Sequence, residues 1–183
     1  MRDTDAEGTG RVSAPGAAFD TNFGSLADTL AFAEFLGGRL RIGDLVLLEG
    51  GLGAGKTTFV QGLARGMGLT AAAKSPTYTL VHEYRAAAPE RPGLGHLDLY
   101  RIPPGRDLGD LGLDELLARG AVAVEWGGRL LDSEADALLL TLAVPADDEP
   151  LEARRLSIGG QGKRGDELSA AAMAWLLLAP QSE

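Results

Sequence analysis

The stretch that decides the fold reads Leu45-Val46-Leu47-Leu48-Glu49-Gly50-Gly51-Leu52-Gly53-Ala54-Gly55-Lys56-Thr57-Thr58. Its four consecutive apolar residues predict a buried strand, and the apolar spacing from Phe59 to Met67 predicts a helix directly afterwards. The turn between them fits the pattern G-x-x-x-x-G-K-[ST], which begins here at Gly50 and ends at Thr57. A glycine-rich turn between a strand and a helix is the setting that a phosphate-binding loop requires.

The residue types of this turn suit phosphate chemistry. Glycines let phosphate oxygens approach backbone N–H groups that a Cβ would obstruct, and the start of the helix adds its positive end. Lys56 can reach the β- and γ-phosphates of a nucleotide, and the Thr57 hydroxyl can ligate a magnesium ion that bridges them. The alternative is a strand–helix turn that binds no ligand. The expected nucleotide contacts are Gly50, Gly51, Leu52, Gly53, Ala54, Gly55, Lys56, Thr57 and Thr58.

Composition limits the class of protein. A chain of 183 residues with 45% hydrophobic residues suits one domain with a substantial core. The net charge of −9 argues against a broad nucleic-acid-binding face, and the absence of cysteine excludes disulfides and thiolate metal sites. No apolar run approaches the roughly 18 residues that a membrane span needs, so we expect a cytoplasmic protein with no membrane contact.

The order of elements predicts an α/β fold. We expect a disordered tail over residues 1–16 and one domain over residues 17–180. Strands are predicted at residues 17–21, 44–49, 95–101, 121–124, 138–143 and 151–158, and residues 74–84 begin as a loop and become a strand. Helices are predicted at 26–40, capped by Ser25 and frayed at Gly37-Gly38, and at 56–67, 107–118 and 165–179. Strands and helices alternate in the first part of the chain, and the last two strands could pair with each other. This order favours a P-loop NTPase-like single domain, with a mixed central sheet and helices on both faces. The nucleotide is expected at the carboxyl ends of the strands.

Three further residues could complete a hydrolytic site. Asp98 and Glu125 each follow an apolar stretch, where two carboxylates could serve magnesium or orient water; alternatively, each caps a neighbouring turn. Thr77 lies in Ser75-Pro76-Thr77-Tyr78-Thr79, whose hydroxyls could reach magnesium or the γ-phosphate. The alternative for that segment is a proline-containing turn before an edge strand.

The chain's two histidines and Trp126 are interpreted as structural residues. His82 and His96 are interpreted as strand histidines, because two histidines without cysteine make a poor zinc site. Trp126 is interpreted as a core aromatic residue, and the alternative is that it covers the nucleotide.

Together these blocks resemble the bacterial TsaE (YjeE) family, the small ATPases of tRNA threonylcarbamoyladenosine synthesis. The resemblance spans residues 18–160. It is carried by the glycine-rich loop and by Ser75-Pro76-Thr77-Tyr78-Thr79-Leu80, His96-Leu97-Asp98-Leu99-Tyr100-Arg101 and Val124-Glu125-Trp126. It implies a magnesium-dependent ATPase, weak alone and stimulated by its partners TsaB and TsaD, with tRNA contacted only through that complex.

The resemblance also implies roles for individual residues. Lys56 matches the phosphate lysine, Thr57 and Glu125 match the magnesium site, and Asp98 matches the aspartate important for hydrolysis. Thr77 falls in the segment that behaves as a switch. The chain departs from the family at Gly51, where the family usually has Asp, and the family's arginine near the adenine has no clear match in Pro150-Leu151-Glu152-Ala153-Arg154-Arg155.

Two other functions remain open at this point. One is a small-molecule kinase built on the same loop, although the sequence offers no lid-like run of arginines. The other is a nucleotide-dependent binding module with little hydrolysis of its own, which Gly51 favours because a carboxylate beside the phosphates is missing.

Overall fold

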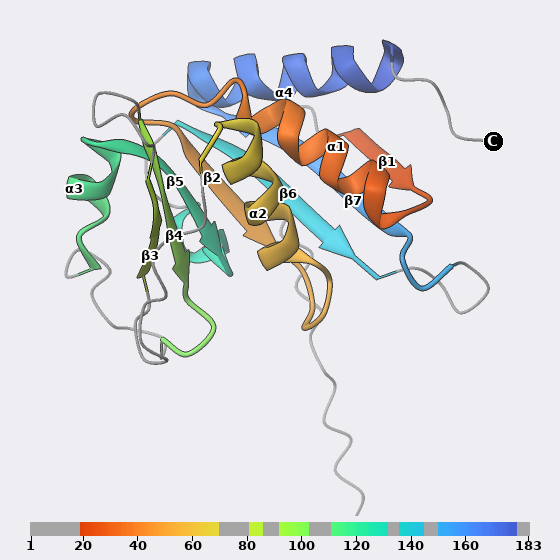
Figure 1. Ribbon diagram of the computed structural model, residues 1–183, viewed down its shortest axis with the longest axis horizontal. Coiled ribbons are helices and arrows are strands. Elements are labelled where there is room, and N and C mark those ends of the chain that lie inside the picture. Colours follow the sequence, from red (N-terminus) through yellow and green to blue (C-terminus); the bar gives the residue numbers. More distant parts are fainter. Residues whose placement is uncertain are drawn as a thin grey trace, which may run out of the picture.

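The computed structural model describes residues 19–69, 81–85, 92–102, 111–131, 136–144 and 150–178. Within these residues, seven strands form one sheet in the order β1-β7-β6-β2-β5-β4-β3 (Figure 1). The strands are β1 (Phe19–Phe23), β2 (Leu45–Glu49), β3 (Val81–Tyr84), β4 (Gly93–Asp98), β5 (Gly120–Glu125), β6 (Ala137–Ala143) and β7 (Arg154–Gln161). The helices are α1 (Leu26–Gly37), α2 (Lys56–Gly66), α3 (Leu113–Leu117), the 3-10 helix η2 (Gly127–Leu130) and α4 (Gly162–Leu178).

The centre of the sheet is parallel and its flanks are antiparallel. β2 lies between β5 and β6 and runs parallel to both, and β4 runs parallel to β5. β3 is antiparallel to β4, and β7 is antiparallel to both β6 and β1. The predicted mixed sheet is therefore confirmed. The parallel strands end at one edge of the sheet. At this edge Asp98 pairs in register with Glu125, and Glu125 pairs with Leu48 of β2.

The core fills both faces of the sheet, which explains the unbroken apolar run of β2. Val46 and Leu48 belong to the cluster that packs against α1, α2 and α4. Leu45 and Leu47 belong to the opposite cluster, which includes Leu116 of α3. A strand covered by helices on both faces has no solvent-facing side and therefore reads as continuously apolar.

The sequence located most elements, with shifts at their ends. Ser25 caps α1 as predicted, because its side chain accepts a hydrogen bond from the Asp28 N–H at 3.2 Å. α1 ends at Gly37, in the Gly37-Gly38 pair predicted to fray its end, and α4 begins at Gly162, three residues before its predicted start. β4 ends at Asp98, short of the predicted Arg101, since the chain turns there.

Some predictions lie outside the described residues, among them the tail over residues 1–16 and residues 107–110 of the predicted helix at 107–118. Among the described residues, no helix is long and apolar enough to cross a bilayer.

Candidate functional site

The glycine-rich loop joins the end of β2 to the start of α2. Gly50, Gly53 and Gly55 have φ values of 134°, 75° and 100°, conformations that L residues rarely adopt. Gly55 is the N-terminal cap of the eleven-residue helix α2. The first N–H groups of a helix have no acceptor within it and are available to an anion. The predicted glycine-rich turn between a strand and a helix is therefore present, with Gly55 at the start of α2.

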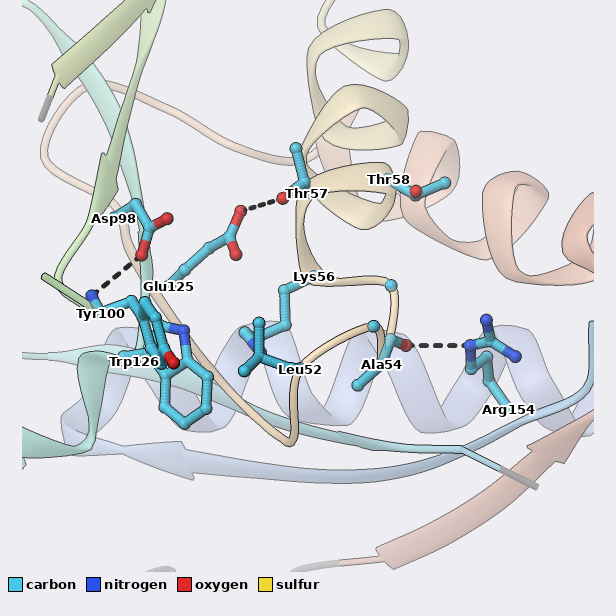
Figure 2. A pocket seen from close by; sticks show the side chains of 12 residues that line it. Leu52, Ala54, Lys56, Thr57, Thr58, Asp98, Tyr100, Glu125, Trp126 and Arg154 are labelled. Atoms are coloured by element: carbon cyan, nitrogen blue, oxygen red, sulfur yellow. Dashed lines mark hydrogen bonds between the residues drawn. The ribbon is translucent and has the colours of Figure 1, made fainter. Parts of the chain in front are cut away.

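Lys56 is the first residue of α2, and its buried side chain extends back alongside the loop (Figure 2). Its Nζ donates to the carbonyl oxygens of Gly50 at 2.6 Å and Gly51 at 2.8 Å, and lies 4.1 Å from the centroid of the Trp126 ring. Burial lowers the pKa of the ammonium below its usual value, against the opposing effect of three carboxylates, those of Glu125, Glu49 and Asp98. A phosphate at the loop would offer this desolvated ammonium a charged acceptor in place of neutral carbonyls.

Thr57, the next residue, faces Glu125 from α2. The Thr57 hydroxyl donates to Oε1 of Glu125 at 2.6 Å, and the same oxygen lies 2.8 Å from Nε2 of His96 on β4. Burial raises the pKa of Glu125, but the hydrogen bonds from His96 and Thr57 and the charge of Lys56 outweigh it and bring the pKa below its usual value. Glu125 is therefore a buried, ionised carboxylate at the end of β5.

The donors at this point fit magnesium. A hydroxyl and a carboxylate supply the hard oxygen ligands that Mg²⁺ prefers, and magnesium commonly takes one or two protein ligands together with substrate phosphates and water. Thr57 and Glu125 lie together beside the glycine-rich loop, so phosphate oxygens bound at that loop would be close enough to share a magnesium ion with them. Within the described ranges, no group of three or more histidine, cysteine or acidic side chains could hold a metal ion alone.

Asp98 lies at the rim of the same site. Its Oδ1 accepts the backbone N–H of Tyr100 at 3.0 Å, so it stabilises the turn after β4 while its exposed carboxylate lines the pocket.

The ring of Trp126 borders the same site. Tyr100 contacts Trp126 with ring centroids 5.2 Å apart. Trp126 has φ 59°, the only positive φ at a non-glycine residue in the described part of the chain. Such conformations cost about 1–3 kcal/mol and cluster at functional sites. Trp126 thus borders the pocket as well as the core.

Arg154 closes the opposite side of the loop, with Lys56 between it and Asp98 (Figure 2). It is the first residue of β7, and its Nε donates to the Ala54 carbonyl at 2.9 Å. The resemblance associates this segment with an arginine near the adenine without a clear match, and in the structure Arg154 contacts the loop. His96 lies in β4, as predicted for a strand histidine, and the structure adds the contact of its ring with Glu125. The two-residue spacing of His96 and Asp98, which puts both on one face of β4, was the available signal.

The assembled pocket has a volume of about 330 Å³, which lies in the range of small-molecule sites. It is lined by residues 52–58 of the loop and by Asp98, Tyr100, Glu125, Trp126 and Arg154. Within the loop, Ala54 is buried, Thr58 is half-buried and Leu52 is 73% exposed. Of the predicted catalytic residues, Lys56 and Asp98 line this pocket, whereas Thr77 lies outside the described residues.

The sheet order, the loop and the position of the pocket define an α/β protein with a P-loop NTPase-like fold. A crystal structure of YdiB from Bacillus subtilis has the same fold, with a TM-score of 0.66 and 27% sequence identity. The match covers 88% of this chain and 98% of that one.

Sequence relatives identify the family. The family model described as threonylcarbamoyl adenosine biosynthesis protein TsaE matches residues 23–155. The TsaE protein of Streptomyces coelicolor is 39% identical over 127 residues, covering 68% of this chain and 85% of that protein. The TsaE protein of Bacillus subtilis is 35% identical over 135 residues, covering 73% and 82%. The chain belongs to the TsaE family, whose members are named for tRNA threonylcarbamoyladenosine biosynthesis.

Proposed function

We propose that this protein binds ATP with magnesium at the glycine-rich loop and hydrolyses it slowly, as an accessory subunit in the threonylcarbamoyl modification of tRNA adenosine. Its partners in this proposal are TsaB and TsaD, which stimulate the hydrolysis, and its compartment is the cytoplasm. The relatives are named for this pathway, and the resemblance noted above supplies the partners and the nucleotide.

One observation carries the proposal. Thr57 at the start of α2 and Glu125 at the end of β5 meet at 2.6 Å beside the loop that holds Lys56. Thr57 and Glu125 are 68 residues apart in the chain. The fold therefore brings together the ammonium of Lys56, the hydroxyl of Thr57 and the buried carboxylate of Glu125. Phosphoryl transfer depends on such positioning and charge stabilisation more than on covalent chemistry by the protein.

Each residue has a separate task in the proposed mechanism. Lys56 and the loop N–H groups bind the phosphates and stabilise charge on the phosphoryl group as it transfers. Thr57 and Glu125 would hold magnesium, which when bound neutralises negative charge on the phosphate oxygens. Asp98, exposed at the rim, would orient the attacking water. Trp126 and Tyr100, whose rings contact each other, line this end of the pocket.

The charge of the chain supports an indirect role toward tRNA. A net charge of −9 opposes binding to a phosphate backbone, whose affinity for proteins depends on lysine and arginine contacts. We therefore assign the tRNA to the partners and the ATP to this chain.

Phosphate release from radiolabelled ATP tests the proposal. The assay compares wild type and Asp98→Ala, each with and without TsaB and TsaD. We expect slow release by wild type alone, faster release with both partners, and a loss of release in Asp98→Ala without a matching loss of ATP binding. Label on a small-molecule acceptor in place of free phosphate would instead favour a kinase.

Gly51 supports one alternative, a nucleotide-dependent binding module with little hydrolysis. Its position is exposed and open, so no side chain stands where the family usually has a carboxylate. Wild type that binds ATP but releases no more phosphate with both partners than Lys56→Ala does would favour this alternative.

A further inference from the structure

His96 makes a contact that the proposed mechanism does not use. Its Nε2 lies 2.8 Å from Oε1 of Glu125, and the two side chains are each 6% exposed. An ionised carboxylate oxygen can only accept hydrogen bonds, so the contact requires a proton on Nε2. Because both groups are buried, water has little access to replace this hydrogen bond if the histidine is removed.

The hydrogen bond continues from Glu125 to Thr57. A threonine hydroxyl has one proton and two lone pairs, and the proton of Thr57 is directed to Glu125 Oε1. The lone pairs of Thr57 are thereby left for a cation. His96 and Thr57 share one oxygen of Glu125, so a carboxylate that loses its contact with His96 loses one of the hydrogen bonds that fix its orientation toward Thr57.

We propose that His96 is a positioning residue for the metal site: its Nε2–H holds the Glu125 carboxylate in the orientation that directs the Thr57 hydroxyl and favours magnesium binding. This inference rests on the proposed function. Removal of a residue that hydrogen-bonds to a metal ligand typically weakens metal binding by about 10- to 100-fold.

A packing role for the same ring is the rival explanation. The His96 ring lies near Tyr84, with centroids 6.4 Å apart, and near His82, with centroids 5.9 Å apart. A ring that only fills space between strands is replaceable by an apolar side chain, whereas a hydrogen-bond donor is not. Glutamine can present an amide N–H close to the position of Nε2, and asparagine, shorter by one methylene, falls short of it.

The test measures ATP affinity by calorimetry in EDTA and in excess Mg²⁺ for wild type, His96→Leu, His96→Asn and His96→Gln. The control is His82→Leu, which removes the neighbouring exposed histidine. We expect the affinity in EDTA to stay near that of wild type in every variant. The enhancement by Mg²⁺ should fall about 10- to 100-fold in His96→Leu and His96→Asn, and persist in His96→Gln and in the control.

Several results would overturn the inference. They are a full Mg²⁺ enhancement in His96→Leu and His96→Asn, an equal loss in His96→Gln, or a parallel loss of affinity in EDTA. If His96→Leu does not fold, the asparagine and glutamine variants decide, because they differ only in reach. Wild type that binds no ATP in either buffer would refute the proposed function and this inference with it, whereas Mg²⁺-dependent binding that ignores His96 refutes the inference alone.

Discussion

Gly50 and Gly51 are adjacent glycines with opposite tolerance for a side chain. Gly50 has φ 134°, and a Cβ there would collide with the backbone carbonyl oxygen of Leu142 on β6 and lie 3.3 Å from the Cβ of Ala54. Gly51 lacks a positive φ and has open space around the position of its Cβ. We therefore expect Gly50→Ala to be strongly destabilising and Gly51→Ala to be tolerated.

The magnitudes follow from these two environments. At Gly50, backbone strain of about 1–3 kcal/mol adds to overpacking of about 1–3 kcal/mol. The total of about 2–6 kcal/mol corresponds to a melting temperature lower by about 4–24 °C. At Gly51, the loss of unfolded-state entropy stabilises the protein by about 0.4–1 kcal/mol.

Denaturant unfolding of both variants, followed by circular dichroism, measures these differences, and ATP titration of the folded variants shows the effect on the loop. Gly50→Ala should also bind ATP more weakly, since the shifted backbone carries the phosphate-facing N–H groups. Equal stability of the two variants would refute the loop geometry from which this reasoning starts.

Three further predictions concern charged side chains of the site. Lys56→Ala should weaken ATP binding about 10- to 100-fold, because a hydrogen bond to a charged group contributes about 1.5–3 kcal/mol; unchanged affinity in a filter-binding assay would contradict this. Because its folded-state pKa is lowered, Glu125 contributes stability that is present above its unfolded-state pKa and is lost as the pH falls through the lowered value. Glu125→Gln should therefore lose less unfolding free energy than wild type between about pH 7 and pH 3 in urea titrations, and parallel curves would count against it. Arg154→Ala should weaken ATP binding, because it removes the hydrogen bond to the loop carbonyl of Ala54. Arg155→Ala is its matched control on the other face of β7, and equal loss in both variants would indicate an effect of charge alone.

The central strand, its loop and α2 were predictable because local signals agree there. Four apolar residues, a glycine pattern and a helical period each point to the same element, and burial on both faces of the sheet reinforces the strand. Asp98 and Glu125 could be placed at the site for a related reason. Parallel strands end at one edge, so a polar residue at each strand end is brought to the same crevice.

His96 and Arg154 could not be placed in the same way. The spacing of His96 and Asp98 puts both on one face of β4, but the contact of His96 with Glu125 also depends on the register between β4 and β5, which the sequence does not give. Arg154 comes next to Ala54, 100 residues earlier in the chain, only because β7 turns back antiparallel beside β6. Long-range pairing of this kind is absent from local periodicity. The predicted boundaries of α1 and α4 differ by a few residues from the observed ones, because helix boundaries depend on caps that the apolar pattern locates only to within a few residues.

Calorimetric titration of ATP into wild type, Thr57→Ser and Thr57→Val, each with and without Mg²⁺, tests the central claim most directly. Valine keeps the shape of threonine and removes the hydroxyl that lies 2.6 Å from Glu125. The account predicts one ATP per chain, tighter binding with Mg²⁺ in wild type and Thr57→Ser, and no Mg²⁺ enhancement in Thr57→Val. Absence of ATP binding by wild type, or a full Mg²⁺ enhancement in Thr57→Val, would contradict it.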